Sequence, residues 1–307
     1  SNTVEVVYMT TKPKTDLPTH VYIESALRPS TLLCEQISTV SEGRIGEWIG
    51  ELTDDEAKEL DVALAISLGM NEICFTDHVD FEYPPENGQT IFRINTKEYF
   101  NTLAALRDSY KNRIKIKIGI ELGLNPSIEE MNSSFVKSND FDFVIGSSHI
   151  INGNDPYYPE FWDGKSIKEA VMSYFEAILR NVTTYENYDV YGHLDYIRRY
   201  IPDKEYVYVD NDFYEITEMI FKNIIFKGKG IELNTRALTS GITNFIPTIT
   251  LLKRFRDLGG EIVTLGSDSH YVKNLGYAFT TAKDILINTG FRYVTTFEHR
   301  TPSFIKL

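Results

Sequence analysis

The sequence predicts an α/β fold built as one barrel-like domain, and three observations lead to that prediction. Short runs rich in β-branched and aromatic residues recur along the chain, and their apolar residues are nearly continuous, as in parallel strands covered on both faces. Segments with helical spacing lie between these runs. No linker rich in proline, glycine or serine divides the 307 residues, so the repeated alternation of strand and helix favours a single α/β domain.

The expected elements follow from the apolar pattern. The expected strands cover residues 5–9, 72–76, 116–121, 141–147, 189–193, 230–234, 261–267 and 292–297. The expected helices cover residues 53–69, 97–112, 166–186, 210–226, 247–258 and 280–289. Two helices begin with a capping box, formed by Thr53 with Glu56 and by Ser166 with Glu169. Residues 27–50 follow neither period, and we expect them to be an insertion.

Composition excludes several classes of protein. Hydrophobic residues make up 42% of the chain and aromatic residues 13%, which is too much apolar material for a disordered chain. The formal net charge of −13 disfavours nonspecific binding to nucleic acid or to anionic lipid. Two cysteines cannot form a disulfide framework, and no apolar run approaches the roughly 20 residues that span a bilayer. We therefore expect a cytoplasmic protein with neither a nucleic-acid partner nor a membrane partner.

Polar residues occur at the ends of five expected strands. They are Asp77 and His78, Glu121, His149, His193 and Asp195, and Asp268 and His270. In an α/β barrel the carboxyl ends of the strands meet on one face, where active sites are built. One such histidine alone is more often a hydrogen-bonded core residue, and Asp77 and Asp195 are equally consistent with caps or turns. Their coincidence favours a site for Zn²⁺, Fe²⁺ or Mn²⁺, which accept mixed imidazole and carboxylate ligands.

The residues around these strand ends resemble a known family. FTDHVDF, GIELGL, FDFVIGSSHIINGNDPYY, VYGHLDYIRRY, IELNT and VTLGSDSH resemble, in order and spacing, motifs of the polymerase and histidinol phosphatase (PHP) superfamily of metal-dependent phosphoesterases. Within it, the bacterial histidinol-phosphate phosphatase branch is the most similar. The resemblance runs from about residue 15 to the C-terminus. It implies a single distorted (β/α)7 barrel with two to three divalent metals (Zn, Fe or Mn). It also implies an enzyme that hydrolyses histidinol phosphate in histidine biosynthesis.

The resemblance also implies roles for individual residues. The implied metal ligands are His20, His78, Glu121, His149, His193, Asp268 and His270. Glu121 would bridge two metals, which together can polarise a phosphoryl oxygen and activate water at neutral pH. The sequence leaves open whether Asp268, His270 or a metal-bound water protonates the leaving group.

A phosphate monoester is a dianion and needs cationic anchors. Arg198 and Arg199 follow one strand end and Arg236 follows another, and a guanidinium group suits bidentate binding of phosphate. By the family pattern we expect Arg199 and Arg236 to bind it, whereas one arginine of the pair is equally explained by a solvated helix face. The expected partner is a small phosphorylated substrate, and the sequence leaves a homo-oligomer open.

The first strand departs from the family pattern Asp-x-His-x-His. Residues 16–20 read DLPTH, so Pro18 stands where the first histidine belongs, and its side chain has no ligand atom. We interpret His20 as the surviving ligand, and residues 27–50 as a lid or the source of a replacement carboxylate. Two outcomes follow: a phosphatase acting on histidinol phosphate or another small phosphate ester, or a degenerate relative that binds phosphorylated ligands without hydrolysis.

Overall fold

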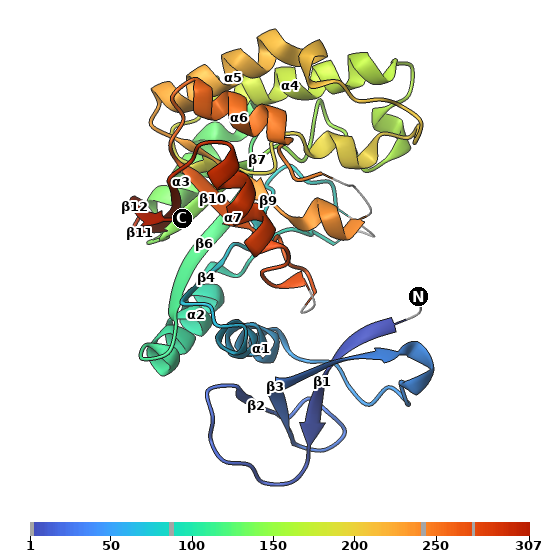
Figure 1. Ribbon diagram of the computed structural model, residues 1–307, viewed down its shortest axis with the longest axis vertical. Helices are drawn as coiled ribbons and strands as arrows, with labels where there is room; N and C mark the ends of the chain where they lie inside the picture. The colour runs from blue at the N-terminus through green and yellow to red at the C-terminus, as the bar shows by residue number, and fades with distance from the viewer. Residues whose placement is uncertain (1–2, 86–88, 241–243, 272–273) are drawn as a thin grey trace. The chain divides into compact units, whose positions relative to one another are not determined.

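A computed structural model of the chain describes residues 3–85, 89–240, 244–271 and 274–307. These residues form two compact units (Figure 1). The first unit comprises Ser1–Cys74, Asn95–Lys117 and Ser269–Gly276, and the second comprises Phe75–Ile94, Ile118–Asp268 and Tyr277–Leu307. We expected one barrel domain over residues 1–307, whereas the described residues divide into these two units.

The first unit contains a three-stranded antiparallel sheet in the order β1-β3-β2. Its strands are β1 (Thr3–Thr10), β2 (His20–Ile23) and β3 (Ser30–Ser41), and its helices are η1 (Glu42–Arg44), α1 (Asp54–Ser67) and α2 (Thr96–Tyr110). Helix α1 packs against β2 and β3, and the buried side chains there include Val21, Leu32, Cys34 and Leu64.

Two sequence interpretations of this region are corrected by the sheet. Residues 27–50 are not simply inserted between elements, because they supply β3, the middle strand. Residues 16–20 do not form the end of a parallel barrel strand, because His20 begins β2 and β2 pairs antiparallel with β3. The apolar run at 5–9 lies in β1, which also pairs antiparallel with β3. The interpretation of this region as the first strand of the barrel is therefore wrong.

Helix α1 begins at the predicted capping box. Thr53 Oγ1 accepts a hydrogen bond from the Glu56 N–H at 3.2 Å, and Glu56 Oε2 accepts one from the Thr53 N–H at 2.9 Å. The other oxygen, Glu56 Oε1, accepts from the N–H groups of Glu24 at 2.7 Å and Ser25 at 3.2 Å. Glu56 therefore joins the segment after β2 to the first turn of α1.

A seven-stranded sheet has the order β10-β9-β8-β7-β6-β4, with β5 beside β6. The strands are β4 (Glu72–Phe75), β5 (His78–Val79), β6 (Lys115–Gly123), β7 (Phe143–Ser147), β8 (Val190–Tyr191), β9 (Gly230–Asn234) and β10 (Val263–Gly266). The pairs from β5 to β10 are parallel, which confirms the predicted α/β class. Within the described residues the path of paired strands ends at β4 and β10, so the sheet is open there.

The second unit also contains the helices that alternate with these strands along the chain (Figure 1). They are α3 (Glu129–Lys137), α4 (Ile167–Thr184), α5 (Tyr214–Phe226), α6 (Ile249–Asp257) and α7 (Phe279–Asn288), with short 3-10 helices η2 (Pro126–Ile128), η3 (Pro159–Phe161), η4 (Tyr196–Tyr200), η5 (Asp210–Phe213) and η6 (Arg236–Ser240). Strands β7 and β9 are buried along their whole length, as near-continuous apolar strands should be. Among the described helices, none is both long and apolar enough to span a membrane.

The predicted strand at 292–297 exists but belongs to a separate hairpin, β11 (Tyr293–Glu298) and β12 (Thr301–Lys306). The turn of this hairpin binds the segments that precede β7 and β8. The Arg300 N–H donates to the Asp142 carbonyl oxygen at 2.9 Å, and Arg300 Nε donates to Asp189 Oδ2 at 2.5 Å. Asp189 Oδ2 also accepts from the Val144 N–H at 2.8 Å. The hairpin is thus fixed at the amino ends of two central strands.

Candidate metal centre

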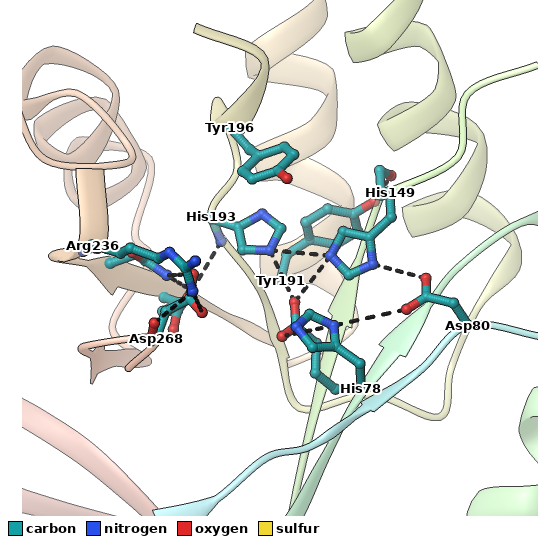
Figure 2. A network of polar contacts seen from close by, with 12 residues as sticks. His78, Asp80, His149, Tyr191, His193, Tyr196, Arg236 and Asp268 are labelled. Atoms are coloured by element: carbon teal, nitrogen blue, oxygen red, sulfur yellow. Dashed lines mark hydrogen bonds and ion pairs between the residues drawn. The ribbon is translucent and has the colours of Figure 1, made fainter. Parts of the chain in front are cut away.

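Four ligand-type side chains converge at the carboxyl ends of four neighbouring strands. His78 lies in β5 and Glu121 in β6, opposite one another in the parallel register. His149 follows β7 and His193 follows β8. Figure 2 shows the three imidazole rings pointing toward one another. Parallel neighbours bring their carboxyl ends to one edge of the sheet, and the predicted grouping of these four residues is therefore present.

The ligand atoms of this cluster lie close to one another. His193 Nε2 lies 2.9 Å from Glu121 Oε1, and His149 Nε2 lies 3.3 Å from the same oxygen. The two Nε2 atoms are 3.4 Å apart. His78 Nδ1 lies 3.6 Å from the other carboxylate oxygen, Glu121 Oε2. His78, Glu121 and His149 offer ligand atoms that all lie within 4.8 Å of one another, and this nitrogen and oxygen set fits Zn²⁺, Fe²⁺ or Mn²⁺.

Burial makes the charges of the cluster depend on one another. The side chains of Glu121, His149 and His193 are buried. Burial opposes the charge on Glu121, but His78, His149 and His193 outweigh it and hold the pKa of this carboxyl well below its usual value. Burial likewise opposes protonation of His149, but Asp80 and Glu121 raise its pKa well above the usual value. A divalent cation would take the place of such protons among the same donors.

Asp80 belongs to this cluster, although no role was predicted for it. Asp80 Oδ1 lies 2.8 Å from His149 Nδ1, and Asp80 Oδ2 lies 3.8 Å from His78 Nδ1 (Figure 2). The sequence does contain a signal for it. Asp80 follows His78 by two positions, and in an extended segment that spacing places both side chains on the same face.

A second polar group lies after β9 and β10. Arg236 Nη1 donates to Asp268 Oδ1 at 3.0 Å and to the Asp268 carbonyl oxygen at 2.9 Å (Figure 2). Glu232 in β9, for which no role was predicted either, accepts a hydrogen bond from the backbone N–H of His193 at 3.0 Å. Burial raises the pKa of Glu232 to about 7. The structure therefore pairs two expected functional residues, Arg236 and Asp268, with each other.

The two arginines of the DYIRRY motif have different surroundings. Arg198 Nη1 donates to Asp195 Oδ2 at 3.0 Å, and Asp195 is fully buried. Asp195 Oδ2 also accepts a hydrogen bond from the Thr248 N–H at 3.2 Å, so Asp195 links the DYIRRY motif to the start of α6. Arg199 instead places its guanidinium over the Tyr200 ring, 5.6 Å from the centroid. The ion pair with Asp195 gives Arg198 a structural role, and phosphate binding by Arg198 or Arg199 stays a prediction.

Two of the expected ligands belong to the first unit. His20 Nδ1 lies 2.7 Å from the Thr15 carbonyl oxygen, and His20 Nε2 lies 3.1 Å from Glu35 Oε1. His270 is exposed within Ser269–Gly276, a segment of the same unit. The roles of His20 and His270 as metal ligands, and of His270 in proton transfer, stay predictions.

Comparison with known proteins agrees with the fold and the cluster. The model of the PHP domain family matches residues 55–236. Histidinol-phosphatase of Lactococcus lactis subsp. lactis IL1403 is 37% identical over 246 residues, which cover 79% of this chain and 89% of the relative. The crystal structure of histidinol phosphate phosphatase from the same organism, complexed with zinc, L-histidinol and phosphate, aligns with a TM-score of 0.72 at 35% identity, covering 79% of this chain and 91% of that chain.

The parallel sheet and its imidazole and carboxylate cluster define a metal-binding α/β protein. Together with the matches they show that the chain belongs to the PHP domain family, in its histidinol-phosphatase branch.

A second family model, the PemK-like, MazF-like toxin of type II toxin–antitoxin systems, matches residues 1–68. This range contains β1, β2, β3 and α1, and it overlaps the PHP match only within residues 55–68. The three-stranded sheet therefore lies outside the PHP match. We expected the PHP resemblance to begin near residue 15, and the family model instead begins at residue 55.

Proposed function

We propose that the chain is a metal-dependent phosphomonoesterase that hydrolyses L-histidinol phosphate to L-histidinol and inorganic phosphate. The convergence of Glu121, His149 and His193 at the carboxyl ends of parallel strands is the observation that carries this proposal. The choice of substrate is supported by the Lactococcus lactis relative, whose crystal structure holds zinc, L-histidinol and phosphate.

Glu121, His149 and His193, with His78 beside them, are the residues that would hold a divalent metal. When bound, divalent ions supply Lewis acidity toward a phosphoryl oxygen and lower the pKa of water. We propose two to three ions of Zn, Fe or Mn and a distorted (β/α)7 barrel, as the family resemblance implies. For ions beyond the first centre, the family resemblance implies His20, Asp268 and His270 as ligands.

The remaining site residues would act on the phosphate and on the leaving group. Arg199 and Arg236 would bind phosphate oxygens, because a guanidinium group can donate two parallel hydrogen bonds to them. The Asp268 carboxyl, held by Arg236 at 3.0 Å, would donate a proton to the leaving oxygen of histidinol, with His270 as the alternative donor.

The test is phosphate release after reconstitution with Zn²⁺, Mn²⁺ or Fe²⁺. We expect kcat/KM for L-histidinol phosphate to exceed that for p-nitrophenyl phosphate by roughly 100-fold or more, because polar groups built for one leaving group reject another. A chelator should abolish the activity. If the parent released phosphate no faster than His193→Ala with any of the three metals, the proposal would be contradicted. If a wider panel contained an ester that the enzyme prefers, the proposed substrate would change.

A second candidate function is binding of a phosphorylated ligand without hydrolysis. One observation favours it: His20, the ligand expected from the first strand, lies in the antiparallel sheet with its ring nitrogens facing Thr15 and Glu35. This candidate predicts one tightly bound metal or none, whereas the proposed hydrolase predicts two or more. Elemental analysis of the reconstituted protein, together with the phosphate assay, separates the two.

A further inference from the structure

A buried carboxylate that is not among the proposed ligands contacts His149. Asp80 is 4% exposed, and its Oδ1 lies 2.8 Å from His149 Nδ1. The opposite nitrogen, Nε2, faces Glu121 Oε1 at 3.3 Å and His193 Nε2 at 3.4 Å. A neutral imidazole that donates its Nδ1–H to a carboxylate presents its lone pair at Nε2. The hydrogen bond to Asp80 therefore favours the tautomer whose Nε2 lone pair points into the cluster.

The space for Asp80 depends on one glycine in the neighbouring strand. In the parallel register His78 lies opposite Glu121 and Val79 opposite Leu122, and continuing this register brings Asp80 beside Gly123. A Cβ atom at position 123 would lie 1.8 Å from Asp80 Oδ1 and 2.6 Å from its Cγ. No left-handed backbone angle explains this glycine, so its requirement is one of space.

We propose that Asp80 is a positioning residue that fixes His149 for metal binding, and that Gly123 is required because it leaves room for Asp80. This inference rests on the proposed metal centre. The same carboxylate faces a second imidazole, because Asp80 Oδ2 lies 3.8 Å from His78 Nδ1. One side chain thus acts on candidate ligands from β5 and from the segment after β7. In metal sites, loss of such a carboxylate lowers metal affinity by roughly 10- to 100-fold.

The experiment is a double-mutant cycle read by Zn²⁺ affinity, measured in competition with a chelator. We expect Asp80→Ala and Gly123→Ala each to lower the affinity by roughly 10- to 100-fold. In the Asp80→Ala background the added methyl group has no carboxylate to displace, so Gly123→Ala should change the affinity by no more than about twofold. Gly43→Ala is the matched control, because a Cβ there meets nothing within 4 Å.

A second measurement needs no variant at either position. In ¹⁵N-histidine spectra of the zinc-loaded parent, with signals assigned by their loss in His149→Gln, His149 should carry its proton on Nδ1. Single variants with parental affinity, additive losses in the double variant, or a proton on Nε2 would each overturn the inference. A parent that binds no Zn²⁺ would instead contradict the proposed function, and the inference with it. Thermal unfolding of each variant identifies any that does not fold.

Discussion

Glu121 is the residue on which the candidate metal centre depends most, because its carboxylate lies within 3.6 Å of all three imidazole rings. Glu121→Gln keeps the shape of the side chain but removes the charge that balances those rings. We expect Zn²⁺ affinity to fall by more than about 100-fold, since loss of even an indirect partner costs roughly 10- to 100-fold.

Calorimetric titration with Zn²⁺ checks this expectation. The matched control is Glu176→Gln, the same change at an exposed position of α4, which should bind as the parent does. Parental affinity in Glu121→Gln would place the metal elsewhere in the chain.

Cys34 should be chemically inert in the folded protein. Its side chain is fully buried, and this burial, with the nearby charges of Glu35 and Glu59, raises the pKa of the thiol to about 12. Because the thiolate is the reactive form, we expect iodoacetamide at pH 8 to label Cys34 at least about 100-fold more slowly in the native protein than in guanidinium chloride. Mass spectrometry of Cys34 peptides measures both rates, and equal rates would show that the site opens readily.

The residues found from sequence and those missed differ in one physical respect. Glu121, His149 and His193 were predicted because each comes at the end of an apolar strand, which a linear pattern reveals. Asp80 and Glu232 were missed because their roles depend on what lies across the sheet: a ring nitrogen of His149 and the backbone N–H of His193. Register between strands determines those neighbours, and a single sequence does not specify it.

At the scale of elements, Glu56 does more than cap α1. Burial opposes its charge, but hydrogen bonds from Ser25, Thr53 and Glu24 outweigh it and lower the pKa of Glu56 to about 2. A lowered folded pKa gives stability that is present above the unfolded value near 4.5 and is lost as pH falls toward 2. Glu56→Gln should therefore lower the free energy of unfolding by about 1 kcal/mol at pH 7 and by less at pH 4.

Denaturant unfolding at the two pH values measures this difference. Glu169→Gln is the matched control, because Glu169 forms the same capping box on α4 with Ser166 but has no hydrogen bond described to a second segment. Glu169→Gln should lower the free energy of unfolding by less than Glu56→Gln does. A Glu56→Gln effect that is equal at both pH values would contradict the role of the charge.

The hairpin of β11 and β12 should contribute to stability without affecting metal binding. Arg300→Ala removes the cation that faces Asp189, a carboxyl whose burial already raises its pKa. We expect the free energy of unfolding to fall by about 1–3 kcal/mol, the usual effect of leaving a buried polar group without its partner. Zn²⁺ affinity should not change, and Arg113→Ala, at an exposed position, should alter neither quantity.

Among the elements, α1, α2, α4, α5, α6 and α7 were predicted, whereas helix α3 and the antiparallel pairing of the first sheet were not. The capping boxes at Thr53 and Ser166 marked the starts of α1 and α4 correctly. Strand β3 was missed because its burial does not alternate: residues 32–34 are all buried and residues 35–37 are all exposed. The register between β1 and β3 also shifts between Val7 and Tyr8, which disrupts the two-residue period that identifies a half-buried strand.

At the scale of the whole molecule, metal binding should stabilise the fold. A ligand that binds only the folded state at roughly 100 times its Kd adds about 2.7 kcal/mol. For a unit of this size we expect Zn²⁺ to raise Tm by roughly 5–10 °C. The net charge of −13 acts in the same direction, because bound cations reduce self-repulsion. Scanning calorimetry with and without Zn²⁺ measures the shift, and an equal shift in Glu121→Gln would assign it to binding outside the cluster.

The family could be predicted from sequence, but the division of the chain could not. The motifs from FTDHVDF onward carried the resemblance, and the family match covers residues 55–236. No change in composition marks where the first unit ends. The two family matches overlap within helix α1 (Asp54–Ser67), and only Asp54 lies outside the PHP match. A continuous helix gives no linker signal, so we expected one barrel domain over residues 1–307 and a family resemblance from about residue 15.

The hairpin turn at His299 and Arg300 and the histidine cluster lie at opposite ends of the same strands: Asp142 and Asp189 precede β7 and β8, whereas His149 and His193 follow them. Mutations at one end can therefore be selected for robustness while those at the other are selected for chemistry. In laboratory evolution toward a new phosphate ester, changes after the strands should alter turnover, whereas changes at the hairpin should provide the tolerance that lets such variants fold.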